Sequence, residues 1–353
     1  MSKLYPADVR LGSTGVLMPP AWRLRTPIDL ASVELVWHGE TPPPRVTGQR
    51  EETRALRPLS AENRHYTRYH RAMRDLNRPK LFENRLCYRL LNVDAPSANR
   101  VSLDLTLGNM CYFDMIDVSE ALAHEVALAA VDTGGAVKSN SLTLDRLPFR
   151  RLVGDPFTLG SYPLMLSVST LTVRRSNAGA TFLLLRRNPA KVAIAGGMLS
   201  VFPTGVFQPA SVIPAPNSPD FDLWPNVMRE YSEEYLGNPE HDGDGPPIDY
   251  DNEDPFRSLD AARRAGKIRV YCLGVGIDAL NYVGDVLTVA VFDDDIFDRI
   301  FDGMVQENEE GDVDREVFPF DGPTIERLLT TQPLAPSGAA CLYLAREHQA
   351  LLS

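Results

Sequence analysis

The stretch MREYSEEYLG, residues 228–237, decides how this chain is interpreted. It places three glutamates, Glu230, Glu233 and Glu234, within five positions, between two tyrosines and just ahead of a glycine. Such a stretch is either an ordinary solvated helix face or a carboxylate cluster that holds a metal ion. Most of what the sequence indicates about function depends on which of the two it is.

The flanking residues predict a helix over 223–236. Asp222 is a good N-cap, and Pro225 falls in the first turn, where its missing N–H does no harm. Gly237 suits the left-handed position after the last turn, and Pro239 prevents continuation of the helix. At about 100° per residue, one apolar stripe is expected to be buried beside the three glutamates. The stripe consists of Trp224, Val227, Met228, Tyr231 and Tyr235.

Three carboxylates on one helix arc repel one another, and each raises the pKa of the others. The arrangement becomes favourable when a hard divalent cation binds, because Mg²⁺ and Mn²⁺ prefer carboxylate oxygens. The alternative is a glutamate-rich solvated face that pairs with Arg229 and other bases. The glutamates alone leave both interpretations open.

Composition limits the class of protein. The chain has 353 residues, 44% of them hydrophobic, which is enough for a sizeable core. With 36 Lys and Arg against 47 Asp and Glu, the formal net charge is −11, so broad binding to nucleic acid is disfavoured. An acidic protein still binds phosphates where a metal ion or a few arginines reverse the local field.

Cysteine usage and hydropathy predict a reduced, cytoplasmic protein with no membrane segment. The cysteines form no CxxC motif, so neither a zinc finger nor a disulfide framework is expected. No basic segment followed by an apolar run opens the chain, and runs such as residues 286–292 are far too short to cross a bilayer. The cysteines are Cys87, Cys111, Cys272 and Cys341.

The order of elements predicts two regions. Residues 1–140 form an N-terminal α+β region of unknown role, and the polar, glycine-containing stretch at 132–141 marks its end. Strands and helices interleave from residue 165 onward, which favours a mixed sheet covered by helices. The expected strands are 33–39, 86–93, 100–108, 165–175, 180–187, 191–205, 267–278 and 285–292. The expected helices are 63–76, 117–131, 223–236 and 258–265, with two more closing the chain.

Residues 229–234 resemble the core of the Nudix box, Arg-Glu-x-x-Glu-Glu, and Arg229 and the three glutamates occupy its defined positions. The segment 192–209 is similar to the strand, turn and proline/glycine loop that precede the catalytic helix in that family. The likeness covers about residues 160–350 and is close in character to the Nudix-like C-terminal regions of actinobacterial helix-turn-helix regulators.

The chain departs from the family pattern at several positions. Gly237 comes one residue late, and the upstream Gly and Glu of the box would fall at Ala215 and Phe221. About ten residues, 210–219, are inserted ahead of the helix. The box is therefore degenerate.

The resemblance implies an α+β fold in which residues 141–353 form a Nudix-like mixed sheet sandwiched between helices, with residues 1–140 as an extension. It implies a hydrolase that uses Mg²⁺ or Mn²⁺ to cleave a phosphoanhydride in a nucleoside-diphosphate-linked small molecule. The alternative is a catalytically inactive Nudix-like protein that binds or senses a ligand in regulation. The missing upstream Gly and Glu motivate this second hypothesis.

The resemblance also assigns roles to residues. Glu230, Glu233 and Glu234 would be metal ligands, and Glu233 and Glu234 would act in catalysis together with Arg229, which would orient the glutamates. Arg187 and Gly205 would contact the substrate. The general base is not assigned by the resemblance; Glu253 and Asp254 are candidates in the acidic loop.

Overall fold

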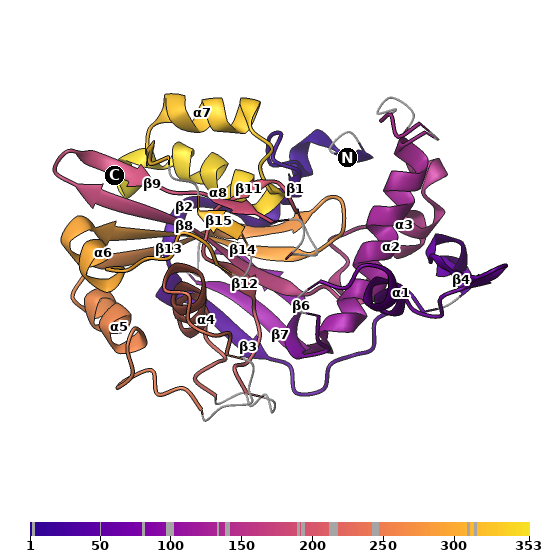
Figure 1. Cartoon of the computed structure of the whole chain (residues 1–353), viewed down its shortest axis with the longest axis horizontal. Helices are drawn as coiled ribbons and strands as arrows, with labels where there is room; N and C mark the ends of the chain where they lie inside the picture. Colours follow the sequence, from indigo (N-terminus) through magenta and orange to yellow (C-terminus); the bar gives the residue numbers. More distant parts are fainter. Residues whose placement is uncertain are drawn as a thin grey trace.

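A mixed β-sheet forms the centre of the molecule, as Figure 1 shows. The computed structural model describes residues 1, 4–49, 51–79, 82–96, 102–132, 134–137, 142–188, 191, 195–211, 218–241, 247–308, 311–313 and 316–353. The strands of this main sheet are β1 (Val16–Leu17), β2 (Arg23–Asp29), β8 (Leu166–Ser176), β9 (Gly179–Phe182), β12 (Thr204–Val206), β13 (Ile268–Asp278), β14 (Gly284–Asp293) and β16 (Phe318–Pro319).

Strands β8 and β14 run parallel at the centre of the sheet, while β13 and β9 flank them antiparallel. The register of the parallel pair places Asp285 opposite Ser167 and Leu287 opposite Ser169. Residues 284–292 of β14 are all buried. Such a continuous buried run is typical of a strand that is covered on both faces.

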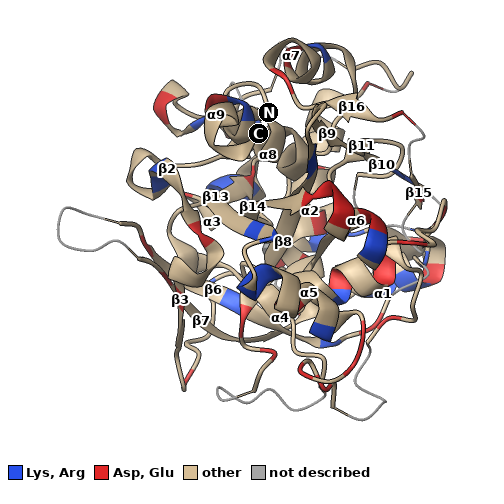
Figure 2. Cartoon of the chain, turned by 90° about the vertical axis from the view of Figure 1, so that its left-hand side faces the viewer, with Lys and Arg blue, Asp and Glu red and all other residues tan. Residues whose placement is uncertain are grey.

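Helices cover both faces of the main sheet. Figure 1 shows α7 (Gly322–Thr331) and α8 (Pro336–Glu347) over one face, and α4 (Leu223–Glu230) and α5 (Phe256–Arg264) under the other. In Figure 2, α6 (Asp294–Ile300) lies on the same side as α4 and α5. The expected α+β fold with a mixed sheet between helices is confirmed.

The N-terminal region adds a smaller sheet in the order β3 (Val33–Trp37), β7 (Leu103–Cys111), β6 (Leu86–Asp94). The helices α1 (Tyr69–Leu76), α2 (Tyr112–Ala130) and α3 (Pro148–Val153) lie together beside it (Figure 1). The remaining elements are the hairpin β4 (Leu59–Ala61) and β5 (Arg64–His65), the sheet β11 (Leu199–Ser200), β10 (Leu185–Arg187), β15 (Gly311–Val313), and the short helix α9 (Gln349–Leu352).

One apolar core joins the two sheets. Strand β6 reaches the main sheet through hydrogen bonds from the Leu90 N–H to the Leu164 carbonyl (3.0 Å) and from the Tyr88 N–H to the Phe207 carbonyl (3.1 Å). Buried side chains of β6 and β7 belong to the same packed cluster as those of β8 and β14. The predicted boundary after residue 140 stays a prediction.

Four expectations about local structure are wrong. The single strand expected over 180–187 is two strands, β9 and β10, which belong to different sheets. The predicted helix over 63–76 begins only at Tyr69, because Arg64 and His65 pair with β4 as a strand. The helix predicted to start at 117 begins at Tyr112, where the Asp114 carboxylate accepts a hydrogen bond from the Cys111 N–H (3.0 Å). The single strand expected over 191–205 is two short strands, β11 and β12, and its residues 192–194 lie outside the described residues.

The surface mixes charges of both signs. Figure 2 shows acidic and basic residues interspersed along α5 and α6, which supply Arg257, Asp260 and Arg263 on α5 and Asp294 and Arg299 on α6. Among the described residues, no helix combines the length and the apolar content that a membrane span requires.

Candidate functional site

The helix predicted over 223–236 forms, but its second half is π-helical. Helix α4 begins after Asp222, whose carboxylate accepts a hydrogen bond from the Trp224 N–H (2.8 Å). It continues into a π-helical turn, Tyr231–Tyr235, that carries Glu233 and Glu234. The apolar stripe predicted for this helix is buried throughout. π-Helical turns inside α-helices are rare and frequently occur at functional sites.

The π-turn accounts for the late glycine. A π-helix holds more residues per turn than an α-helix, so one additional residue is accommodated without shifting what precedes it. Gly237 has φ +68° and donates its N–H to the Glu233 carbonyl (3.1 Å), while Asn238 donates its N–H to the Ser232 carbonyl (3.1 Å). The one-residue departure from the family spacing is therefore absorbed within the helix.

The three glutamates have three different surroundings. The Glu230 carboxylate lies directly against Gly205, and a β-carbon added to Gly205 would overlap it, so the carboxylate would have to move. Glu233 Oε1 accepts a hydrogen bond from the backbone N–H of His241 (3.0 Å) and lies 3.0 Å from its ring Nδ1. Glu234 is 4% exposed, and its Oε1 accepts a hydrogen bond from the Thr204 N–H (2.6 Å).

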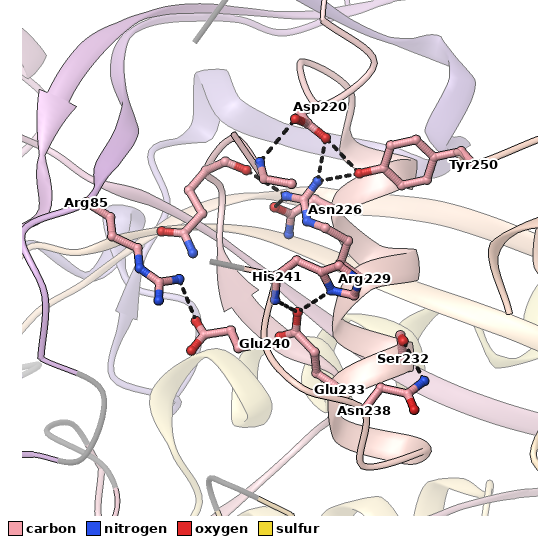
Figure 3. Close-up of polar contacts among 12 residues, drawn as sticks. Arg85, Asp220, Asn226, Arg229, Ser232, Glu233, Asn238, Glu240, His241 and Tyr250 are labelled. Atoms are coloured by element: carbon pink, nitrogen blue, oxygen red, sulfur yellow. Dashed lines mark hydrogen bonds and ion pairs between the residues drawn. The ribbon is translucent and has the colours of Figure 1, made fainter. Parts of the chain in front are cut away.

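Arg229 is buried in a polar network. Figure 3 shows its guanidinium directed at Asp220 and Tyr250. Its Nη1 lies 3.1 Å from Asp220 Oδ1 and 2.8 Å from the Tyr250 hydroxyl, and its Nη2 donates to the Gln208 carbonyl (2.6 Å) and to Asn226 Oδ1 (2.9 Å). Burial lowers the pKa of Arg229, but Tyr250 and Asp220 more than offset this and leave it above its usual value. These contacts fasten α4 to the segments before and after it.

A cavity of about 260 Å³ lies beside the helix. This approaches the lower end of the range for small-molecule sites, about 300–1,000 Å³. Arg229 and the two general-base candidates, Glu253 and Asp254, do not line the cavity, whereas the other predicted site residues do. They are Arg187, Gly205, Glu230, Glu233 and Glu234.

The N-terminal region contributes one wall of this cavity. Pro79, Glu83, Arg85 and Tyr112 line it together with the residues of the helix. Arg85 Nη1 lies 3.3 Å from Glu240 Oε1, so an ion pair joins the segment just before β6 to the loop that follows the π-turn (Figure 3). The cavity is thus shared between the two predicted regions.

Strands of the main sheet also contribute to the cavity. Asp278 at the end of β13 and Asp285 at the start of β14 line it. The Ser169 hydroxyl of β8 donates a hydrogen bond to Asp285 Oδ1 (2.9 Å). Burial raises the pKa of Asp285 to about 7 and that of Asp278 to about 6. We call these two aspartates the strand floor, and the helix with Glu230, Glu233 and Glu234 the helix wall.

The helix wall does not form a shared metal centre in the geometry described. Among the described residues, no three His, Cys, Asp or Glu side chains converge closely enough to hold one ion. The hydrogen bonds of Glu233 to His241 and of Glu234 to Thr204 direct these carboxylates to separate partners. The residues present therefore do not fit a three-carboxylate Mg²⁺ or Mn²⁺ site as they stand.

Sequence reasoning missed several residues of the site. His241 and Asp220 lie in the loops on either side of the helix and show no motif of their own. Asp285 has a signal that could have found it, because it is the one charged residue in GDVLTVAVF, 284–292, an otherwise apolar strand. A charged residue inside a buried strand needs a partner or a function.

No family model and no curated protein matches the chain. Solved structures do match: the NUDIX domain of Shewanella oneidensis NrtR complexed with ADP ribose (17% identity, TM-score 0.29) covers 53% of this chain and 88% of that domain. The Nudix hydrolase RenU of M. smegmatis (14%, TM-score 0.26) covers 53% and 86%, and a NUDIX hydrolase of Alicyclobacillus acidocaldarius (15%, TM-score 0.30) covers 54% and 96%.

All three are Nudix proteins, the family that residues 229–234 resemble. At these identities and TM-scores the likeness carries no argument about activity or ligand.

Proposed function

We propose that the cavity binds a small nucleotide-like molecule that carries a diphosphate, and that the protein is a Nudix-like ligand-binding protein. The observation that carries this proposal is the composition of one cavity. Arg187 and the first turn of α8 line it together with the carboxylates of the helix wall. A molecule with an anionic end and a hydroxyl-bearing end matches such a lining.

The anionic end is expected at Arg187. Strand β11 brings Arg187 and α8 together, because the Arg187 N–H donates to the Met198 carbonyl (2.9 Å) and the Ala335 N–H donates to the Leu199 carbonyl (2.8 Å). Pro336 and Ser337, the first residues of α8, line the cavity. The N-terminus of a helix carries a partial positive charge and exposed N–H groups, both of which favour an anion.

The hydroxyl-bearing end is expected at the helix wall. Ionised carboxylates only accept hydrogen bonds, so they suit the hydroxyl groups of a sugar and repel a phosphate. Glu230 and Glu233 are partly exposed and line the cavity. This orientation places the diphosphate away from the glutamates without requiring a bound cation.

Isothermal titration calorimetry with ADP, ADP-ribose and nucleoside-diphosphate sugars, in a chelator, tests the proposal. We expect at least one of them to bind, and Arg187→Gln to weaken its binding by about tenfold or more, since a hydrogen bond to a charged group contributes about 1.5–3 kcal/mol. Arg186→Gln is the matched control, because Arg186 is exposed on the same strand. Absence of binding to the whole panel would contradict the proposal.

Hydrolysis of the bound molecule is the second candidate. It is favoured by one observation, that all three glutamates of the degenerate box line the same cavity. Two measurements separate ligand binding alone from hydrolysis. The first is titration of Mn²⁺ into the wild type and into Glu233→Gln, and the second is an assay for released phosphate-containing products. Tight Mn²⁺ binding that Glu233→Gln abolishes, together with product release by the wild type only, would establish the enzyme.

A further inference from the structure

Asp285 has an environment that the Nudix resemblance does not explain. It stands at the start of β14, immediately after Gly284, and is 8% exposed. It belongs to the strand floor, on the side of the cavity formed by β13 and β14, while the glutamates come from the helix wall. Its neighbours along the strand, Gly284 and Val286, are apolar.

One oxygen of Asp285 is bonded within the protein and the other faces the cavity. Oδ1 accepts the hydrogen bond of the Ser169 hydroxyl at 2.9 Å. For Oδ2, no hydrogen-bond partner occurs among the described residues, although the residue lines the cavity. Oδ2 does not belong to the fully buried oxygens that lack a partner, so it is open to the cavity, and a ligand there can contact it.

The charged and titratable groups around Asp285 come from three elements. They are Asp278 on β13, Arg187 on β10 and Cys341 on α8. Burial raises the pKa of Asp285 most, the Ser169 hydrogen bond lowers it, Asp278 raises it further, and Arg187 lowers it, to about 7 in total. Burial also raises the pKa of the Cys341 thiol well above its usual value, so this thiol stays neutral.

We infer that Asp285 binds an anionic group of the ligand through its protonated carboxyl, so that the cavity takes up the anion together with one proton. The inference rests on the proposed function and specifies the chemistry of its anionic end. Ionised Asp285 would repel an anion held at Arg187 and the first turn of α8. The protonated carboxyl instead donates a hydrogen bond from Oδ2, the oxygen that is open to the cavity.

The experiment is titration calorimetry with ADP-ribose, whose internal diphosphate keeps a constant charge near neutral pH. Above the pKa of Asp285 in the unliganded protein, we expect the affinity of the wild type to fall by about tenfold per pH unit. In two buffers of different ionisation enthalpy at about pH 8, close to one proton should be taken up per ligand bound. This second readout needs no variant and therefore holds even if a variant fails to fold.

Asp285→Asn distinguishes proton-coupled binding from a merely structural role. Its amide donates a hydrogen bond but does not titrate, so its affinity for ADP-ribose should be independent of pH. It should bind more tightly than the wild type by about tenfold at pH 8, one unit above the pKa. The exposed Asp302→Asn is the control and should reproduce the wild-type pH profile.

The outcomes separate the two proposals. Binding by the wild type with no proton uptake, or a pH profile that Asp285→Asn shares, would overturn the role of Asp285 and leave the proposed function standing. Absence of ADP-ribose binding at any pH, in wild type and variant alike, would overturn both. Proton uptake by the wild type together with a flat profile in Asp285→Asn supports both.

Discussion

The helix wall and the strand floor face the same cavity but hold their carboxylates in different ways. Glu233 and Glu234 of the helix wall accept hydrogen bonds from nearby backbone N–H groups, and Arg229 beneath them is tied into a buried network. Asp285 of the strand floor has one hydroxyl partner and a raised pKa. The helix wall thus holds these carboxylates through backbone N–H groups, whereas burial raises the pKa values of the two strand-floor aspartates.

Arg229→Met should lower the stability of the protein most, because it disrupts the buried network that holds the helix wall. It leaves the buried Asp220 without its cation and removes the bonds to Gln208 and Asn226. Breaking a buried, hydrogen-bonded ion pair costs about 3–5 kcal/mol, and we expect a loss of that size in the free energy of unfolding measured in urea. Arg257→Met, at an exposed ion pair with Asp254, should cost less than about 0.5 kcal/mol. Equal losses in both variants would contradict this account.

In contrast to the helix-wall variant, Asp285→Asn should stabilise the fold at high pH. The pKa of Asp285 rises from 3.8 to about 7 on folding, so the folded state of the wild type loses stability as pH rises through this interval. A pKa shift of about three units corresponds to about 4 kcal/mol. This value is the upper limit for the variant's gain in free energy of unfolding at pH 8. The gain should vanish near pH 4, and Asp302→Asn should show no gain at either pH.

The sequence predicted the helix wall because its residues are neighbours in the chain. Capping by Asp222, the buried stripe and the glutamates at i, i+3 and i+4 all follow from local periodicity. The π-turn could not be predicted from the sequence. It differs from an α-helical turn by a single residue, and whether it forms depends on how the helix packs against the sheet. The central strands and the α+β class were predicted from short apolar runs. In such runs the residues both favour an extended backbone and supply side chains for the core.

The strand floor was not predicted because it exists only in three dimensions. Asp285 and Ser169 are separated by 116 positions and meet through the parallel pairing of β8 and β14. The contribution of Arg85 to the cavity likewise depends on how the N-terminal region packs. No pattern within a short window carries such information, although the isolated charge in an apolar strand marks the position.

Gly205→Ala tests how closely the helix wall is packed. A β-carbon would overlap the Glu230 carboxylate, which must then move away from β12. Because the displaced group is the end of a flexible side chain, we expect a moderate loss of about 1–2 kcal/mol in chemical unfolding. In a Glu230→Ala background the same substitution should cost almost nothing, since the overlap is gone. Gly39→Ala, with open space around its β-carbon, is the control.

Glu234→Ala and Glu233→Ala compare two positions within the π-turn and give the smallest expected effects. Glu234 is buried, and its loss leaves the Thr204 N–H without its acceptor, which should cost about 1 kcal/mol or somewhat more. The Glu233–His241 pair is partly exposed, at 17% and 26%, so Glu233→Ala should cost about 0.5 kcal/mol or less. Urea unfolding of both variants measures the difference. A larger cost at Glu233 than at Glu234 would contradict this account, in which Glu234 contributes more to stability than Glu233.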